Sequence, residues 1–463
     1  MNNTYLAVDF GAGSGRVIAG HIENKKLLLD ELHRFPNRQI KLGKHIYWDF
    51  LSLYEEMKTG IRKAVQAGYN VKSIGIDTWG VDFGLIDKAG NLLANPMCYR
   101  DSCTAGVVEE VFSRISRTDH YRESGIQVMP INTLFQLYAL QKENPRLFEC
   151  AEHLLFMPDL FSYFLTGNCD NEYSIASTSE LLNATTRSWN TGLMAQLGLP
   201  LHLFTKPVIM PGTSRGRITA AVAAETGLSP DTEVIAVGSH DTASALFAVP
   251  FPPGRESRCA FLSSGTWSLL GAELDAPVLT EEARQAGFTN EGGVGGKIKF
   301  LQNITGLWIL QRLMQQWEER GEKTGYDTLL SAAGQSRAAA IIDVDDTGFA
   351  NPPDMERAID EYCLATGQDK PETKGDYAIC VLKSLALRYK RAIGQLNALL
   401  PQPVEQLHII GGGSRNKLLN RLTEEAAGVP VVVGPAEATA TGNILLQAIA
   451  SGEVRDKNEI NIL

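Results

Sequence analysis

The chain is 463 residues long, 44% hydrophobic and 21% charged, with a formal net charge of −10. This length predicts two or three domains, and an acidic chain without a basic run is not a typical nucleic-acid-binding protein. Because no apolar run approaches the roughly 18 residues of a membrane span and the start Met-Asn-Asn-Thr lacks the features of a secretory signal, we expect a cytoplasmic protein with no membrane and no nucleic-acid partner.

The first half of the chain is predicted to begin with strands and to become helical later. Three β segments are predicted at 5–10, 16–22 and 26–34, followed by a helix at 49–67 and a short buried strand at 72–77. Residues 81–96 are predicted to form a hairpin that turns at 88–91. Residues 104–200 are mostly helical patches, and 216–245 return to a helix, a strand and a second helix.

The second half is predicted to repeat the plan of the first. Residues 249–256, VPFPPGRE, contain three prolines and a glycine and indicate a linker. After it come a strand, a Ser-Ser-Gly-Thr turn and a strand at 259–274, a helix at 382–400, a strand, triple-glycine turn and helix at 407–428, a strand at 429–434 and a helix at 439–452. We therefore expect one α/β domain at 1–249 and another at 250–463.

The seven cysteines are odd in number and form no C-x-x-C pair. We therefore expect reduced thiols rather than a zinc site or a disulfide framework. Cys363 and Cys380 are the one pair whose bonding the sequence leaves open.

The turn between the first two predicted strands reads GAGSGR, at 11–16. Glycine lets another group approach the backbone closely, and a hydroxyl and a guanidinium stand beside the glycines. The spacing matches neither the Rossmann fingerprint, which a helix must follow, nor a P-loop. Two interpretations stay open from these residues alone, a cradle for phosphate and a glycine-rich hairpin without a ligand.

Asp241 lies between a strand predicted at 234–237 and a helix that starts at Thr242. A carboxylate at a helix N-terminus is stabilised as the anion, so it is able to accept a proton at neutral pH. The alternative is an ordinary capping residue. Gly412 lies after a strand and before a helix, where glycine lets a flat group approach the backbone.

Several long stretches are similar, in order, to one protein family. They include VDFGAGSGRV, SIGIDTWGVDFGLID, SGIQVMPINTLFQLYAL, FMPDLFSYFLTG, SHDTASA, FLSSGTWSLLG and LHIIGGGSRNKLLN. In these stretches the chain resembles the FGGY carbohydrate kinases, from Val8 to Ala450. The resemblance implies an α/β fold of two actin-like (ribonuclease H-like) domains that flank a central cleft. Ala12, where many relatives have Thr, favours the members that act on L-rhamnulose.

The resemblance also implies a reaction, the phosphorylation of the C1 hydroxyl of L-rhamnulose by ATP with Mg²⁺, giving L-rhamnulose 1-phosphate and ADP. Asp241 would be the catalytic base, and Asp9 would hold Mg²⁺ directly or through water. The residues expected to bind ATP are Ala12, Gly13, Ser14, Gly15, Arg16, Thr266, Gln311 and Gly412. The residues expected to contact the sugar are Gly80, His240, Asp241, Thr242 and Asn303.

The residues themselves leave other interpretations open. Asp9 and Thr266 would equally suit turns, Gln311 would suit a solvated face of a helix, and Trp79 could belong to the core or pack on the sugar. Two other functions also stay open. One is a family kinase for another ketose, such as L-fuculose or L-xylulose, and the other is an actin-like ATPase or sugar sensor. We expect a monomer or a homodimer.

Overall fold

In the computed structural model, which describes residues 3–460, the chain forms two compact units. Unit 1 contains the chain up to Pro250, the segment Leu274–Phe300 and the chain from Glu437 onward, whereas unit 2 contains Phe251–Glu273 and Leu301–Ala436. The first passage between the units therefore lies in the proline-rich segment, and later segments return to unit 1. The linear division of the domains at residues 249 and 250 stays a prediction.

The centre of unit 1 is a six-stranded sheet in the order β11-β12-β6-β1-β2-β3. These strands are β1 (Thr4–Phe10), β2 (Ser14–Glu23), β3 (Lys26–Pro36), β6 (Val71–Thr78), β11 (Ser214–Arg217) and β12 (Glu233–Ile235). β1 pairs antiparallel with β2 and parallel with β6, and β6 pairs parallel with β12. The three strands predicted at 5–10, 16–22 and 26–34 are confirmed as β1, β2 and β3.

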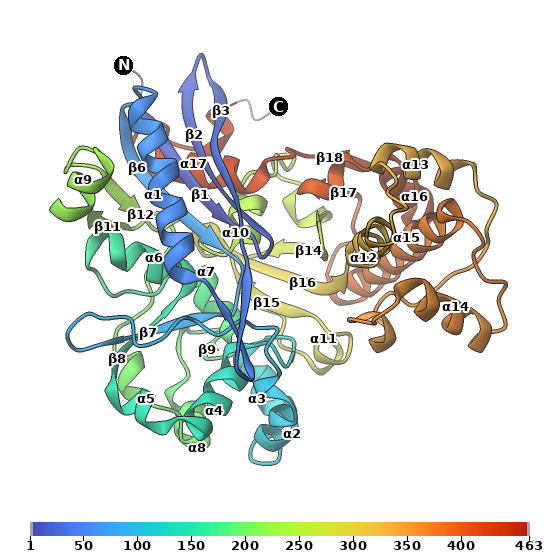
Figure 1. Cartoon of the computed structure of the whole chain (residues 1–463), viewed down its shortest axis with the longest axis horizontal. Helices are drawn as coiled ribbons and strands as arrows, with labels where there is room; N and C mark the ends of the chain where they lie inside the picture. Colours follow the sequence, from blue (N-terminus) through green and yellow to red (C-terminus); the bar gives the residue numbers. More distant parts are fainter. Residues whose placement is uncertain (1–2, 461–463) are drawn as a thin grey trace. The chain divides into compact units, whose positions relative to one another are not determined.

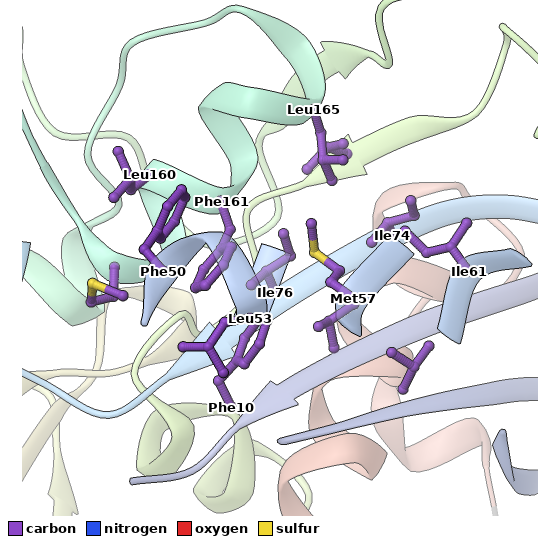
Figure 2. Close-up of a cluster of buried hydrophobic side chains, with 14 of the residues drawn as sticks. Phe10, Phe50, Leu53, Met57, Ile61, Ile74, Ile76, Leu160, Phe161 and Leu165 are labelled. Carbon is purple, nitrogen blue, oxygen red and sulfur yellow. The ribbon is translucent and has the colours of Figure 1, made fainter. Parts of the chain in front are cut away.

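Helices cover both faces of this sheet, which is why every residue of β1 is buried. α1 (Phe50–Gln66) and α6 (Met157–Thr166) lie on one face, and their apolar side chains meet those of β1 and β6, as Figure 2 shows. α17 (Ala438–Ala450) lies against β1 and β6 on the other face and packs on α10 (Asp241–Phe247) (Figure 1).

The alternation of β1 decides on which face its one carboxylate lies. Leu6, Val8 and Phe10 belong to the apolar cluster of α1 and α6, whereas Tyr5 and Ala7 belong to the cluster of α17. Because successive strand residues point to opposite faces, Asp9 shares the face of Tyr5 and Ala7. The first strand thus directs a carboxylate toward the side of the sheet that α17 and α10 cover.

The predicted hairpin at 81–96 is only partly correct. The turn is present, since Asp87 Oδ1 accepts hydrogen bonds from the backbone N–H groups of Ala89 and Asn91 at 2.9 and 2.8 Å. After it, however, Leu92 forms an isolated bridge with Ile86 and no second strand follows in the described segment 88–96. The strand β7 (Phe83–Asp87) pairs instead with the distant β8 (Ala151–Phe156). The turn is a local feature, whereas the strand partner depends on long-range packing.

Unit 2 repeats the strand arrangement of unit 1. Its sheet contains the order β14-β13-β17-β18, in which β13 (Cys259–Ser264) pairs antiparallel with β14 (Trp267–Leu274) and parallel with β17 (Gln406–Ile410). β18 (Val431–Val433) pairs parallel with β17. β2, β1, β6 and β12 have the same order and directions in unit 1, so the predicted recurrence is confirmed.

The helix predicted at 382–400 is longer at its start. It is α15 (Lys374–Leu399), which begins at a capping box formed by Thr373 and Asp376. The remaining helices and strands are β4 (Gln39–Leu42), β5 (His45–Trp48), α2 (Val107–Phe112), α3 (Arg117–Ser124), α4 (Thr133–Glu143), α5 (Pro145–Cys150), α7 (Tyr173–Ala176), β9 (Leu182–Asn183), β10 (Ser188–Trp189), α8 (Thr191–Leu197), α9 (Ala220–Thr226), α11 (Glu281–Gln285), β15 (Thr289–Gly292), β16 (Ile298–Thr305), α12 (Trp308–Glu319), α13 (Tyr326–Gln335), α14 (Met355–Ala365) and α16 (Lys417–Ala427).

Over the described residues, none of the helices combines the length and the apolar character that crossing a membrane would require. Cys363 and Cys380 are both buried free thiols.

Candidate active site

The ends of β1, β2 and β6 bring two carboxylates and one arginine together. Asp9 is in register with Arg16 across the antiparallel pair and with Asp77 across the parallel pair. Arg16 donates to Asp9 and also to Glu437, which precedes α17. Burial raises the pKa of Asp9 against the opposing effect of Arg16. Burial, and next the charge of Asp9, raise the pKa of Asp77 well above its ordinary value.

The glycine-rich turn between β1 and β2 is tight and cross-braced. The N–H of Gly11 donates to the carbonyl of Ser14 at 2.9 Å, and Asn37 donates to the carbonyls of Gly11 and Gly13. Gly15 has no room for a side chain, because a Cβ there would lie 2.3 Å from the ring of Phe35. A Cβ at Gly13 would meet nothing within 4 Å, so that side of the turn is open to a ligand.

The predicted base and sugar residues lie where β12 leads into α10. His240 precedes the helix and Asp241 is its first residue. Asp241 Oδ1 accepts hydrogen bonds from the backbone N–H and the hydroxyl of Thr242, at 2.6 and 3.1 Å. The Asp241 side chain is 33% exposed, whereas that of His240 is 10% exposed. Asp241 can therefore reach a bound molecule, with one oxygen oriented by its own helix.

Two further polar residues fix the backbone just before Asp241. Glu172, fully buried, accepts from the N–H of Ser239 at 3.3 Å and from the hydroxyl of Ser174 at 2.6 Å. The N–H of His240 donates in turn to Ser174 Oγ at 3.2 Å. Neither Glu172 nor Ser174 was predicted from the sequence, because Glu172 caps and Ser174 lies in α7, more than 60 residues earlier in the chain.

Gly80 lies beside the same group. A Cβ at Gly80 would stand 3.3 Å from Thr178 Oγ1 and 3.5 Å from His240 Nε2. The next residue, Val81, has a φ of 70°, a conformation that is strained for a branched side chain. Its N–H donates to Thr178 Oγ1 and its carbonyl accepts from Thr133. Strain that surrounding contacts hold in place is typical of ligand-binding turns.

Trp79 and Asp82 belong to the core. Trp79 is 6% exposed, and its ring lies on that of Trp48 with centroids 4.2 Å apart. Both indole N–H groups donate to Asp82 Oδ2, at 2.6 Å from Trp48 and 2.9 Å from Trp79. The backbone N–H of Tyr99 and the amide of Gln136 also donate to this carboxylate. Asp82 therefore fixes Trp79, the residue directly before Gly80, in the core.

Asp82 should make stability depend on pH. Burial raises its pKa from 3.8 to about 6, even though four donors oppose this. The folded state thus favours the neutral form, so the contribution of Asp82 to stability is largest below pH 4 and falls as the pH rises through 6. Relative to Asp82→Asn, the free energy of unfolding of the wild type should fall by about 2 kcal/mol between pH 4 and 7. Urea unfolding at both pH values measures this, and parallel profiles for the two proteins would contradict it.

In unit 2, the structure brings Thr266 and Gln311 together. Thr266, in the turn between β13 and β14, donates its hydroxyl to Gln311 on α12 at 3.0 Å. Its carbonyl accepts from the N–H groups of Gly306 and Trp308, at 3.1 and 3.2 Å. The turn is therefore fixed to the start of α12. The sequence pattern predicts a helix over 305–318 around Gln311, but Thr305 ends β16 and α12 begins at Trp308.

Gly412 follows β17, whose neighbour is β13. A Cβ at Gly413 would stand 2.1 Å from Ser264 Oγ, whereas a Cβ at Gly412 would meet nothing within 4 Å. Gly412 therefore leaves open space at the strand end. Asn303, on β16, is half-buried.

Among residues 3–460, no three His, Cys, Asp or Glu side chains are arranged so that they alone could hold a metal ion. The strand ends of unit 1 nevertheless suit a cation that is shared with substrate phosphates. The charge of Asp241 raises the pKa of both Asp9 and Asp77, and a cation would relieve this repulsion. Asp77 Oδ1 is moreover buried without a hydrogen-bond partner in the described part of the chain.

Comparison with known proteins shows to which family the chain belongs. Residues 4–248 match the N-terminal domain of the FGGY family of carbohydrate kinases, and residues 260–451 match its C-terminal domain. The chain belongs to the FGGY family of carbohydrate kinases. The expectation of a carbohydrate kinase is confirmed, and an enzyme of this class acts on a small-molecule sugar.

This FGGY kinase also has relatives that align over nearly its whole length. A rhamnulokinase from Bacteroides thetaiotaomicron is 48% identical over 457 residues, 98% of this chain and 92% of that protein. A rhamnulokinase from Oceanobacillus iheyensis is 40% identical over 459 residues, 99% of this chain and 96% of that protein. A rhamnulokinase from Pectobacterium atrosepticum is 42% identical over 453 residues, 97% of this chain and 89% of that protein.

Two solved structures confirm the expected fold of two actin-like domains. Gluconate kinase from Lactobacillus acidophilus superposes with a TM-score of 0.81 at 16% identity, covering 99% of this chain and 91% of that chain. Plasmodium falciparum glycerol kinase with ADP gives a TM-score of 0.79 at 14% identity, with the same coverage.

Proposed function

We propose that this FGGY kinase transfers the γ-phosphoryl group of ATP to the C1 hydroxyl of L-rhamnulose, giving L-rhamnulose 1-phosphate and ADP. The observation that carries the proposal is the identity of 40 to 48% to three rhamnulokinases over nearly the whole chain. The arrangement around Asp241 supports the reaction type, since phosphoryl transfer needs a base beside the acceptor hydroxyl and positive groups beside the phosphates.

Asp241 is the proposed general base. Its carboxylate lies at the start of α10, and Thr242 orients one of its oxygens. Asp241 takes the proton of the C1 hydroxyl as that oxygen attacks the γ-phosphorus. The bond between this phosphorus and the β,γ-bridging oxygen breaks, and that oxygen leaves with ADP.

The sugar would be held by groups that are small or can both donate and accept. Gly80 leaves the space that a side chain would fill beside His240. His240, Thr242 and Asn303 offer a ring nitrogen, a hydroxyl and an amide for the hydroxyl groups of a ketose.

Phosphate binding is proposed at the two glycine-containing turns. In unit 1 these groups are the turn of Ala12, Gly13, Ser14 and Gly15 with the guanidinium of Arg16, and in unit 2 they are Thr266 with Gln311. Gly412 would face the adenosine. Asp9 would hold Mg²⁺ directly or through water, and the ion, when bound, would neutralise charge on the phosphates.

The proposal predicts which ketose this enzyme uses. With MgATP, ADP release should be fastest on L-rhamnulose and at least tenfold slower on L-fuculose and L-xylulose, because a lost or misplaced hydroxyl contact costs about 1–3 kcal/mol. A coupled ADP-release assay and the position of the phosphate in the product measure this.

Faster turnover of another ketose would keep the kinase and change the substrate. Sugar binding without ADP release would contradict the proposal and favour a sensor.

A further inference from the structure

A lysine lies completely buried next to His240. Lys299, on β16, has an exposed fraction of 0%. Its Nζ lies 2.8 Å from His240 Nδ1 and 3.1 Å from Oε2 of Glu291 on β15. All three residues belong to unit 1. A buried ammonium costs free energy unless it is paired. Lys299 therefore depends on its contacts with Glu291 and His240.

The carboxylate of Glu291 balances the charge of Lys299. Burial alone would raise the pKa of Glu291, but the charge of Lys299, the largest opposing effect, lowers it below its ordinary value. The group is therefore a carboxylate at any pH near neutrality. Lys299 Nζ and Glu291 Oε2 form an ion pair.

The donor rules then determine where the proton of His240 lies. An ammonium has three donors and no lone pair, so the contact at 2.8 Å requires His240 Nδ1 to accept. A ring whose Nδ1 accepts carries its proton on Nε2. Glu291 Oε2 lies 3.3 Å from Nδ1. A proton on Nδ1 could be donated to Glu291, but it would also point two donors at one another.

We propose that Lys299, paired with Glu291, is a positioning residue that keeps His240 as the Nε2–H tautomer. His240 Nε2 lies 3.5 Å from Asp241 Oδ1 and borders the space beside Gly80. An Nε2–H group can donate its one proton to Asp241 or to a sugar oxygen, and it cannot take a proton from the sugar. The lysine thereby leaves Asp241 as the only one of the two side chains that can accept the proton of the hydroxyl. This inference rests on the roles proposed above for His240 and Asp241.

The first experiment observes the tautomer directly, without sugar or nucleotide. Full-length protein labelled with ¹⁵N-histidine is studied by long-range ¹H–¹⁵N correlation NMR at pH 8, and the His240 signals are assigned by their loss in His240→Gln. The wild type should show a protonated Nε2 and an unprotonated Nδ1. Lys299→Met should shift His240 toward the Nδ1–H form with Glu291 as acceptor, and Lys299→Arg should retain the wild-type pattern.

The second experiment measures turnover of the same proteins. Lys299→Met should lower kcat roughly tenfold or more, a part of the 10²–10⁴-fold that general base catalysis contributes, and Lys299→Arg should recover most of it. The matched control is Lys297→Met, which removes a partly exposed lysine two residues away that pairs with Asp275. If Lys299→Met does not fold, the double variant Lys299→Met with Glu291→Gln is used in its place, because it removes both buried charges.

The outcomes separate this inference from the proposed function. An Nδ1–H or doubly protonated His240 in the wild type would overturn the inference, whatever the activity. A tautomer change in a folded Lys299→Met or double variant that leaves kcat unchanged would also overturn it. Absence of turnover on any sugar by the wild type would overturn the proposed function, while the wild-type NMR spectrum would still decide the tautomer.

Discussion

Asp241→Asn should lower kcat on the sugar substrate by about 10²–10⁴-fold, the usual contribution of a positioned general base. The amide has nearly the shape of the carboxylate and can still accept from the N–H and the hydroxyl of Thr242. It cannot take up the proton of the attacking hydroxyl. The loss should therefore appear in kcat, with little change in KM or in the melting temperature. Initial rates of ADP release and a thermal melt measure the three quantities.

The matched control for Asp241→Asn is Asp231→Asn. It makes the same substitution in unit 1, at an exposed aspartate that pairs with Arg217 on the surface. Exposed pairs of this kind contribute little to stability, and Asp231 lies outside the proposed site, so kcat should not change. An Asp241→Asn enzyme with wild-type kcat would exclude Asp241 as the base.

Gly442→Ala should have the largest effect on the architecture of the site. Gly442 lies in α17 where this helix crosses α10, and a Cβ there would be 1.8 Å from the carbonyl oxygen of Ser244. The two helices must separate, and overpacking of this kind costs about 3 kcal/mol, or a fall in Tm of roughly 3–5 °C. Because Asp241 begins α10, kcat should fall as well.

Gly394→Ala is the matched control for this substitution. Gly394 lies within the helix α15, and a Cβ there would meet nothing within 4 Å. Alanine is a better helix former than glycine, so this change should stabilise the protein by about 0.5–1 kcal/mol and leave kcat unchanged. Equal Tm values for Gly442→Ala and the wild type would mean that the helix crossing is not tight.

The sequence determined the local features of the site well. The start of β1 and β2, the turn at 11–16 and the strand-to-helix passage at Asp241 depend on periodicity, glycine placement and helix-start signals, all of which act over a few residues. The tight turn of Asp87 was predicted for the same reason. Such features are encoded by neighbours in the chain, so one sequence is sufficient to predict them.

The partners of these features were decided only by the tertiary structure. Asp77 meets Asn443, which donates to it at 2.6 Å from 366 residues further along the chain. β7 pairs with β8 rather than with its own turn. The signal that could have indicated Lys299 is a charged residue between Ile298 and Phe300, but a strand residue of this kind is usually exposed.

The surroundings of Asp241 show the same difference between local features and long-range contacts. The sequence indicated a carboxylate at a helix start and a histidine before it. The packing of distant elements decided their contacts. It placed Glu172 and Ser174 against the backbone of Ser239 and His240, and Lys299 against the ring of His240. The chemical types of these groups can be read from the sequence. Their distances depend on how distant strands and helices pack, because a buried polar group must find its partner wherever the fold places one.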